Sequence, residues 1–151
     1  MRAAELGLRG HAQAGALALE AQFPDIVFTS GRRAVADQAR AMASNMVLNR
    51  RWIAETYKAT EESRQLQAWV SANPNARAQD QLAQGLARIM VGWSDEGRGR
   101  LSKHFSGDAF DVRPVTGEGS RRIPAAIRAL PGLEKFLERE GGLVRWHAQF
   151  R

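Results

Sequence analysis

The pattern of apolar and polar residues near the start of the chain predicts one helix followed by one strand. Residues 3–22 are rich in alanine and leucine, which favours a helix. We expect it to end at Phe23-Pro24-Asp25, because proline cannot continue the helical turn. Ile26–Thr29 is β-branched and aromatic, as expected of a buried strand, and Ser30-Gly31 breaks it. Arg32-Arg33, just past that strand, can reach into a site from a rigid support.

The middle of the chain has apolar residues at three- and four-residue spacings, which predict helices. We expect them over 35–69, with a break in the polar run 58–63, and over 79–91. The run S-A-N-P-N at 71–75 predicts a loop. Residues 92–100 hold three glycines and alternating charges, which predict a surface loop.

The last third of the chain contains both the two-residue alternation typical of strands and the three- and four-residue spacing typical of helices. Ala109–Arg113 alternates as a strand does, and a turn is expected over 116–120. Residues 123–130 and 133–140 predict two short helices, and 143–147 predicts a last strand. We therefore expect one α+β domain over residues 1–151, rich in helix, with a small antiparallel sheet that carries any metal site.

Composition narrows the possible chemistry. The chain has 151 residues, of which 44% are hydrophobic and 25% charged, as is ordinary for a globular domain. It has no cysteine, which excludes disulfides, thiolate zinc sites and a cysteine nucleophile. A metal ion would therefore need nitrogen and oxygen ligands.

The formal charge of +6 favours a polyanionic partner, such as nucleic acid, anionic lipid or the acidic polymers of a bacterial envelope. The arginines are scattered, and no dense basic helix with interleaved aromatics is present. We therefore expect no nucleic acid partner.

Nothing in the sequence predicts a membrane segment or an exported precursor. No run approaches the roughly 18 apolar residues of a transmembrane span. Glu5, Arg9 and Glu20 interrupt the N-terminal region where a signal peptide would be apolar. We expect cytoplasmic synthesis without a signal peptide, and a monomer.

The run L-S-K-H-F-S-G-D-A-F-D-V at 101–112 carries the candidate chemistry. His104 and Asp111 lie on either side of Gly107, which can turn the backbone tightly, and His147 lies near the C-terminus. Two histidines and one carboxylate suit catalytic zinc, which takes three protein ligands and keeps one position open. Spacing alone leaves open that these residues are unrelated, and His11 is expected to be a surface histidine or one whose hydrogen bonds are satisfied within the fold.

Three segments together resemble a known family. Ser30, Gly31 and Arg33 fit the pattern S-G-x-R, and Trp146-His147 fits a final W-H. The central pattern, S-x-H-x-x-G-x-A-x-D, is matched at five positions: Ser102, His104, Gly107, Ala109 and Asp111. This arrangement is similar to the zinc peptidases that include vancomycin-resistance-type D-alanyl-D-alanine carboxypeptidases and phage L-alanyl-D-glutamate endolysins.

The resemblance implies zinc held by His104, Asp111 and His147, with Arg33 stabilising the oxyanion. It implies the Hedgehog/DD-peptidase fold, and the peptide stem of peptidoglycan as substrate within an anionic envelope. A phage or prophage endolysin that acts at the cell wall after release is the expected biological form. The remaining positions implied beside the substrate are Ser30, Gln38, Ser102 and Trp146, although core packing is favoured for Trp146.

One position departs from the family pattern. The family carries a carboxylate, its general base and acid, three residues before the last histidine, and Val144 stands there. Loss of a general base typically lowers the rate by about 10²–10⁴-fold. A regular strand would put Arg145, not Val144, on the face of His147. The carboxylates nearest in sequence are Asp108, Glu138 and Glu140, of which Glu140 is our candidate substitute base.

Three functions therefore stay open. The first is an active zinc peptidase. The second is a metal-binding relative with impaired catalysis that binds the cell wall or a partner. The third is a basic nucleic-acid-binding protein whose match to the motif is accidental.

Overall fold

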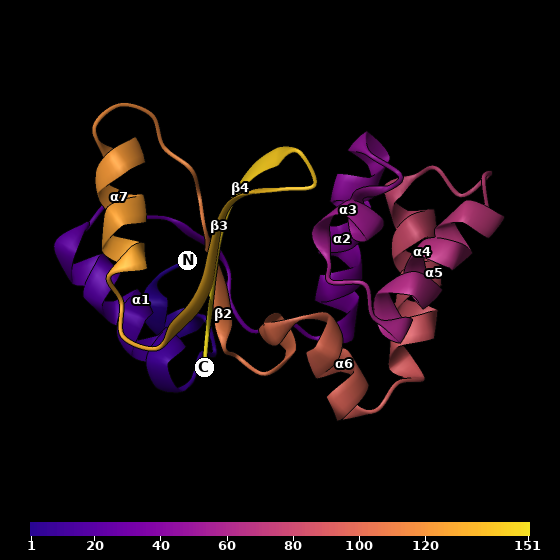
Figure 1. The fold of residues 1–151 in the computed structure, drawn as a ribbon, viewed down its shortest axis with the longest axis horizontal. Helices are drawn as coiled ribbons and strands as arrows, with labels where there is room; N and C mark the ends of the chain where they lie inside the picture. Colours follow the sequence, from indigo (N-terminus) through magenta and orange to yellow (C-terminus); the bar gives the residue numbers. More distant parts are fainter. The chain divides into compact units, whose positions relative to one another are not determined.

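Four antiparallel strands form one sheet in the order β1-β2-β4-β3 in the computed structural model, which describes residues 1–151 (Figure 1). The fold is α+β, as predicted. The chain groups into two compact units, one of Met1–Arg32 with Ser106–Arg151 and one of Arg33–Phe105. The expectation of one domain stays a prediction. The strands are β1 (Phe28–Ser30), β2 (Ala109–Val112), β3 (Leu133–Glu140) and β4 (Leu143–Phe150).

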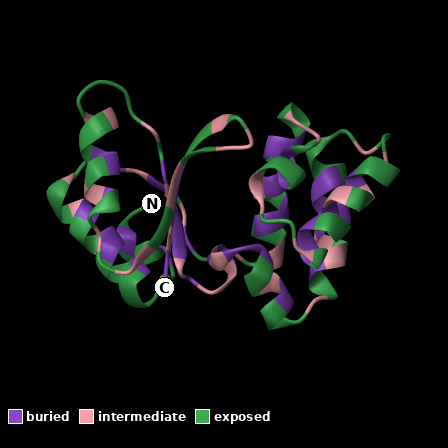
Figure 2. Ribbon diagram, viewed as in Figure 1, coloured by how far each residue is buried: buried purple, intermediate pink, exposed green.

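The sheet belongs to the first unit, and one of its faces forms the hydrophobic core. The same unit contains the 3₁₀ turn η1 (Ala3–Glu5) and the helices α1 (Gly10–Gln22) and α7 (Gly119–Arg128), and both helices lie on one side of the sheet (Figure 1). Buried positions line the sides of α1 and α7 next to the strands (Figure 2). The strand residues in this core are Phe28, Phe110, Val112, Trp146, Ala148 and Phe150.

The residues of β2 and β4 that alternate with these core residues lie on the opposite face of the sheet. Asp111 pairs with His147 and Ala109 with Gln149, one position out of phase with the core residues. Successive side chains of a strand point to opposite faces. The polar side chains of Asp111, His147 and Gln149 thus project from a strand pair whose other face packs in the hydrophobic core.

The second unit is helical. The expected helix over 79–91 is confirmed, and the region 35–69 divides into three helices instead of two. The elements are α2 (Val35–Leu48), α3 (Trp52–Thr56), α4 (Glu61–Ala72), α5 (Gln79–Val91), α6 (Asp95–Leu101) and the 3₁₀ turn η2 (Lys103–Phe105). No helix in either unit has both the length and the hydropathy that crossing a membrane requires.

The predicted helix over 133–140 is wrong, because these residues form β3. Leucine, glutamate, lysine and arginine favour helix locally, but Gly141 and Gly142 adopt φ values of +55° and +80°. Two successive positive φ values suit a two-residue hairpin turn, which returns the chain as β4. Pairing with β4 satisfies the backbone of β3 and overrides local propensity.

The predicted surface loop over 92–100 is also wrong in its second half, which forms α6. The Ser94 hydroxyl accepts a hydrogen bond from the Gly97 backbone N–H at 3.1 Å, so the helix is capped despite its glycines. The Arg100 guanidinium forms an ion pair with Glu62 of α4 at 2.6 Å. A cap and a tertiary ion pair therefore stabilise a segment of low helix propensity.

Two boundaries near the N-terminus differ from expectation. The first helix begins at Gly10, because Gly7 (φ +64°) interrupts the segment after η1. The strand expected at Ile26–Thr29 is displaced to Phe28–Ser30. Its continuation at Gly31 passes close to another backbone, since a Cβ there would lie 2.5 Å from the Leu6 carbonyl oxygen. Glycine is therefore required directly before Arg32 and Arg33.

Candidate metal centre

Asp111 and His147 stand directly opposite each other in the β2–β4 ladder. Nδ1 of His147 lies 2.9 Å from Oδ1 of Asp111, and the Ser30 hydroxyl donates to Oδ2 of the same carboxylate. Ser30 pairs with Asp111 across β1 and β2, after a bulge that accommodates Thr29. Three neighbouring strands thus fix the orientation of this carboxylate and imidazole.

His104 lies in η2, and its backbone is held on both sides. Its N–H donates to the Ser102 hydroxyl at 3.2 Å, and its carbonyl accepts from the Arg33 N–H at 2.9 Å. The histidine is only 3% exposed. The motif serine therefore shapes the turn that carries the histidine.

Gly107 has the conformation that the sequence predicted. Its φ of +83° lies in the left-handed region, and a Cβ would lie 2.9 Å from the Gly7 carbonyl oxygen. Its own carbonyl accepts from the Arg9 N–H at 3.1 Å. The backbone between η2 and β2 thus needs glycine for both conformation and space.

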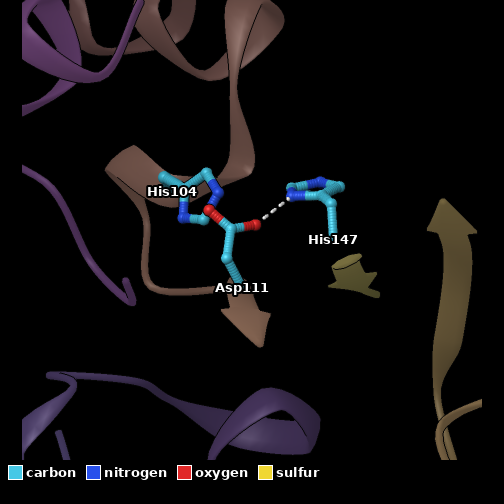
Figure 3. A group of neighbouring side chains, drawn as sticks. All are labelled: His104, Asp111 and His147. Carbon is cyan, nitrogen blue, oxygen red and sulfur yellow. Dashed lines mark hydrogen bonds and ion pairs between the residues drawn. The ribbon is translucent and has the colours of Figure 1, made fainter. Parts of the chain in front are cut away.

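His104, Asp111 and His147 form a group that could hold a metal ion (Figure 3). Each offers one ligand atom, and these atoms all lie within 4.8 Å of one another. A tetrahedral ion with bonds of about 2.0–2.2 Å separates its ligand atoms by roughly 3.4 Å, so modest side-chain adjustment suffices. Two imidazoles and a carboxylate form the nitrogen–oxygen donor set expected of a chain without cysteine.

The environment of His147 favours its protonated form in the metal-free protein. Burial is the largest single influence on its pKa and lowers it. Three neighbours act in the opposite direction: Asp111 through its hydrogen bond and its charge, Glu140 through its charge, and Gln149 through its hydrogen bond. Together they outweigh burial, so the pKa of His147 is raised overall. A cation would take the place of this proton beside Asp111, so this group of side chains is suited to positive charge.

Gln149 contacts the other nitrogen of the same ring. Its Oε1 lies 3.1 Å from Nε2 of His147, and its Nε2 donates to Oε1 of Glu134 at 3.3 Å. Sequence reasoning missed both residues. The alternation of β4 would have placed Gln149 on the face of His147, but no local signal points to Glu134.

Arg33 is held by a partly buried hydrogen-bond chain. Its Nη1 donates to Oε1 of Gln38 at 3.1 Å, and Nε2 of Gln38 donates to the Tyr57 hydroxyl at 3.0 Å. Gln38 is fully buried. The predicted site residues Arg33 and Gln38 are thus in direct contact, and Tyr57 is a partner that the sequence did not reveal.

Trp146 is a core residue. It is 4% exposed and belongs to the hydrophobic cluster on the α1 and α7 side of the sheet. It pairs with Val112, whose side chain lies in the same cluster. This position agrees with core packing, which the sequence favoured over substrate contact for this residue.

Of the three carboxylates considered as substitute bases, two are engaged in ion pairs away from His147. Asp108 accepts from Arg9 through both carboxylate oxygens, at 3.0 and 2.8 Å. Glu138 pairs with Arg128 of α7 at 2.6 Å. Glu140 is half-buried, and its charge contributes to the raised pKa of His147.

Comparisons with models of protein families, with curated proteins and with solved structures found no match to this chain.

Proposed function

We propose that this protein is a zinc-dependent peptidase that hydrolyses the peptide stems of bacterial peptidoglycan, with the Hedgehog/DD-peptidase type of fold. The observation that carries the proposal is the group of His104, Asp111 and His147, which the sequence motif anticipated. Zinc bound there would supply a Lewis acid that polarises a carbonyl and acidifies water.

Arg33 is proposed to bind the carbonyl or carboxylate oxygen of the substrate and to stabilise the oxyanion. Its guanidinium is oriented by Gln38, which is itself buried and held by Tyr57. A fixed, permanently charged donor suits oxyanion stabilisation, because it needs little reorganisation during the reaction. Ser30 and Ser102 act on the ligands: Ser30 orients Asp111, and Ser102 shapes the turn of His104.

Glu140 is proposed as the residue that moves the proton. Of the three carboxylates considered, Glu140 is the one whose charge raises the pKa of the buried imidazole of His147. In that role its carboxylate would accept a proton from water and deliver it to the leaving amine.

The net charge of +6 supports an anionic envelope as the setting. An endolysin that reaches the cell wall after release from the cytoplasm is the proposed biological form. Attraction to the envelope would concentrate the protein at its substrate without contributing to the chemical step.

A second candidate function rests on one specific observation, the apolar side chain of Val144. Val144 occupies the position of the family's catalytic carboxylate and is 43% exposed. A relative that binds metal and cell wall without rapid turnover would have this combination of residues.

Digestion of purified muropeptides tests the proposal. The protein is loaded with one equivalent of zinc, and the products are analysed by mass spectrometry. The peptidase proposal expects shortened stem peptides with a new amino or carboxyl terminus, and a loss of about 10²–10⁴-fold in the Glu140→Gln variant with its zinc content unchanged.

Two other results would overturn this proposal. Stoichiometric zinc and cell-wall pull-down without cleavage would favour the binding domain. Absence of stoichiometric zinc, together with DNA binding that weakens with salt, would favour the nucleic-acid-binding alternative.

A further inference from the structure

Gln149 and Glu134 form a hydrogen-bonded chain that ends on His147. The Gln149 carbonyl oxygen faces Nε2 of the imidazole at 3.1 Å, and its amide nitrogen faces Oε1 of Glu134 at 3.3 Å. His147 is buried, Gln149 is half-buried and Glu134 is exposed. The chain therefore runs from the surface of β3 to a buried ligand on β4.

The chemistry of each group sets the direction of this chain. An ionised carboxylate only accepts hydrogen bonds, so Glu134 directs the amide nitrogen of Gln149 toward itself. The amide oxygen must then face His147, and it can only accept. Nε2 of the imidazole is consequently a donor to Gln149, while Nδ1 donates to the Asp111 carboxylate until a cation takes the place of that proton.

An irregularity in β3 brings Glu134 to this face. Leu133 pairs with Phe150 and Lys135 with Gln149, so two steps along β3 match one step along β4. Glu134 is the extra residue between these pairs. A bulge of this kind redirects a side chain that regular alternation would place elsewhere.

We propose that Gln149 and Glu134 are positioning residues that fix His147 in the Nε2-protonated tautomer, so that Nδ1 is the atom presented to the metal. This inference rests on the metal site in the proposed function but not on peptidase activity. Groups that accept the second ring N–H of a ligating histidine typically change metal affinity by about 10–100-fold when removed.

The test measures zinc affinity by competition with a chromophoric chelator, and the protonation of the two ring nitrogens of His147 by ¹⁵N NMR of the zinc-loaded protein. Gln149→Leu removes the acceptor and should weaken zinc binding by about 10–100-fold. With zinc bound, the native ring should show a protonated Nε2 and a proton-free Nδ1, and the variant should show a mixture of the two forms. Glu134→Gln should weaken binding less, because the amide of Gln149 stays in place but loses its preferred orientation.

Two further variants separate positioning from packing. Glu138→Gln makes the same charge change on the same strand, outside the chain of hydrogen bonds, and should leave zinc affinity unchanged. The double exchange Glu134→Gln with Gln149→Glu keeps an acceptor, now a carboxylate, beside Nε2 of His147. The new amide at position 134 can donate to that carboxylate, so the exchange should restore most of the zinc affinity.

The outcomes separate the inference from the proposed function. The positioning role alone would be overturned if the native protein binds zinc and Gln149→Leu has a zinc affinity within twofold of the native value with the ring nitrogens protonated as in the native protein. Native protein that binds no zinc would overturn the metal site and this inference with it. Failure to cleave muropeptides while zinc affinity responds as expected would remove only the peptidase function.

Discussion

Val144 and His147 project from the same face of β4, although three positions separate them. Leu137 pairs with His147 and Arg139 with Val144, so two steps along β3 match three along β4. Paired residues share a face, and Leu137 and Arg139 lie two apart on one strand. The irregularity thus brings Val144, and not Arg145 as in a regular strand, to the face that carries the candidate ligands.

This relationship predicts that Val144→Glu will increase peptidase activity. A carboxylate there would occupy the face of His147 at the position where the resembling family has its base. A well-placed general base contributes about 10²–10⁴-fold. The measurement is the rate of stem-peptide cleavage by the zinc-loaded protein, with zinc content determined in parallel. Val144→Gln is the matched control, because it has similar size and polarity but cannot accept the proton.

The candidate ligands predict a selective loss of metal. His104→Ala should reduce bound zinc from one equivalent to a small fraction, because removing one of three ligands leaves an incomplete site. His11→Ala provides the control, since this exposed histidine is not in the group. The measurement is elemental analysis after dialysis against trace zinc. Equal zinc in the native protein and the His104 variant would refute the ligand assignment.

Gly107→Ala should destabilise the protein and weaken metal binding together. Alanine would have to adopt a φ of +83° with its Cβ 2.9 Å from the Gly7 carbonyl. A residue other than glycine in such a conformation costs about 1–3 kcal/mol. Thermal unfolding of the metal-free variant measures the loss. Gly99→Ala is the comparison, because a Cβ there meets nothing within 4 Å, and it should be neutral or slightly stabilising.

The Glu62–Arg100 pair predicts an acid-sensitive contribution to stability. The hydrogen bond from Arg100 is the main cause that lowers the pKa of Glu62 below its ordinary value of 4.5. A lowered folded-state pKa means that the stabilisation is present above about pH 4.5 and is lost as the pH falls through the folded-state pKa. The melting temperature of Glu62→Gln should therefore lie below the native value at pH 6, and the difference should narrow as the pH falls below about 4.5.

Asp25→Asn serves as the control for this pH series, because Asp25 is exposed and makes no ion pair. Its melting curve should follow the native one across the same range. A constant difference between native protein and Glu62→Gln down to pH 3 would contradict the assignment to ionisation.

Much of the helical pattern and the chemistry could be predicted from residue order. The apolar spacing of 79–91 gave α5 with its observed ends, and β2 and the first five residues of β4 were expected as strands, although β4 continues to Phe150. His104, Asp111 and His147 were chosen from residue type and motif, and they lie together. These predictions succeeded because local periodicity and donor chemistry are properties of the residues themselves.

Other features depended on partners distant in the chain. Residues 133–140 have helix-forming composition, and only pairing with β4 makes them a strand. Gln38 was a candidate, but its contact with Tyr57 required α2 and α3 to meet. Glu134 reaches Gln149 because of the irregularity in β3, and no local sequence pattern predicts that irregularity.

The sequence by itself determined which groups are available for chemistry: two histidines, an aspartate, an arginine with its glutamine, and a valine where a carboxylate was expected. Tertiary structure alone decided which faces these groups share. A single extra residue in a strand moves every following side chain to the other face, and such irregularities depend on pairing between distant segments. The candidate metal ligands could therefore be predicted from the residue order. The orientation of Val144 and the hydrogen bonds that support His147 depend on the pairing of β3 with β4.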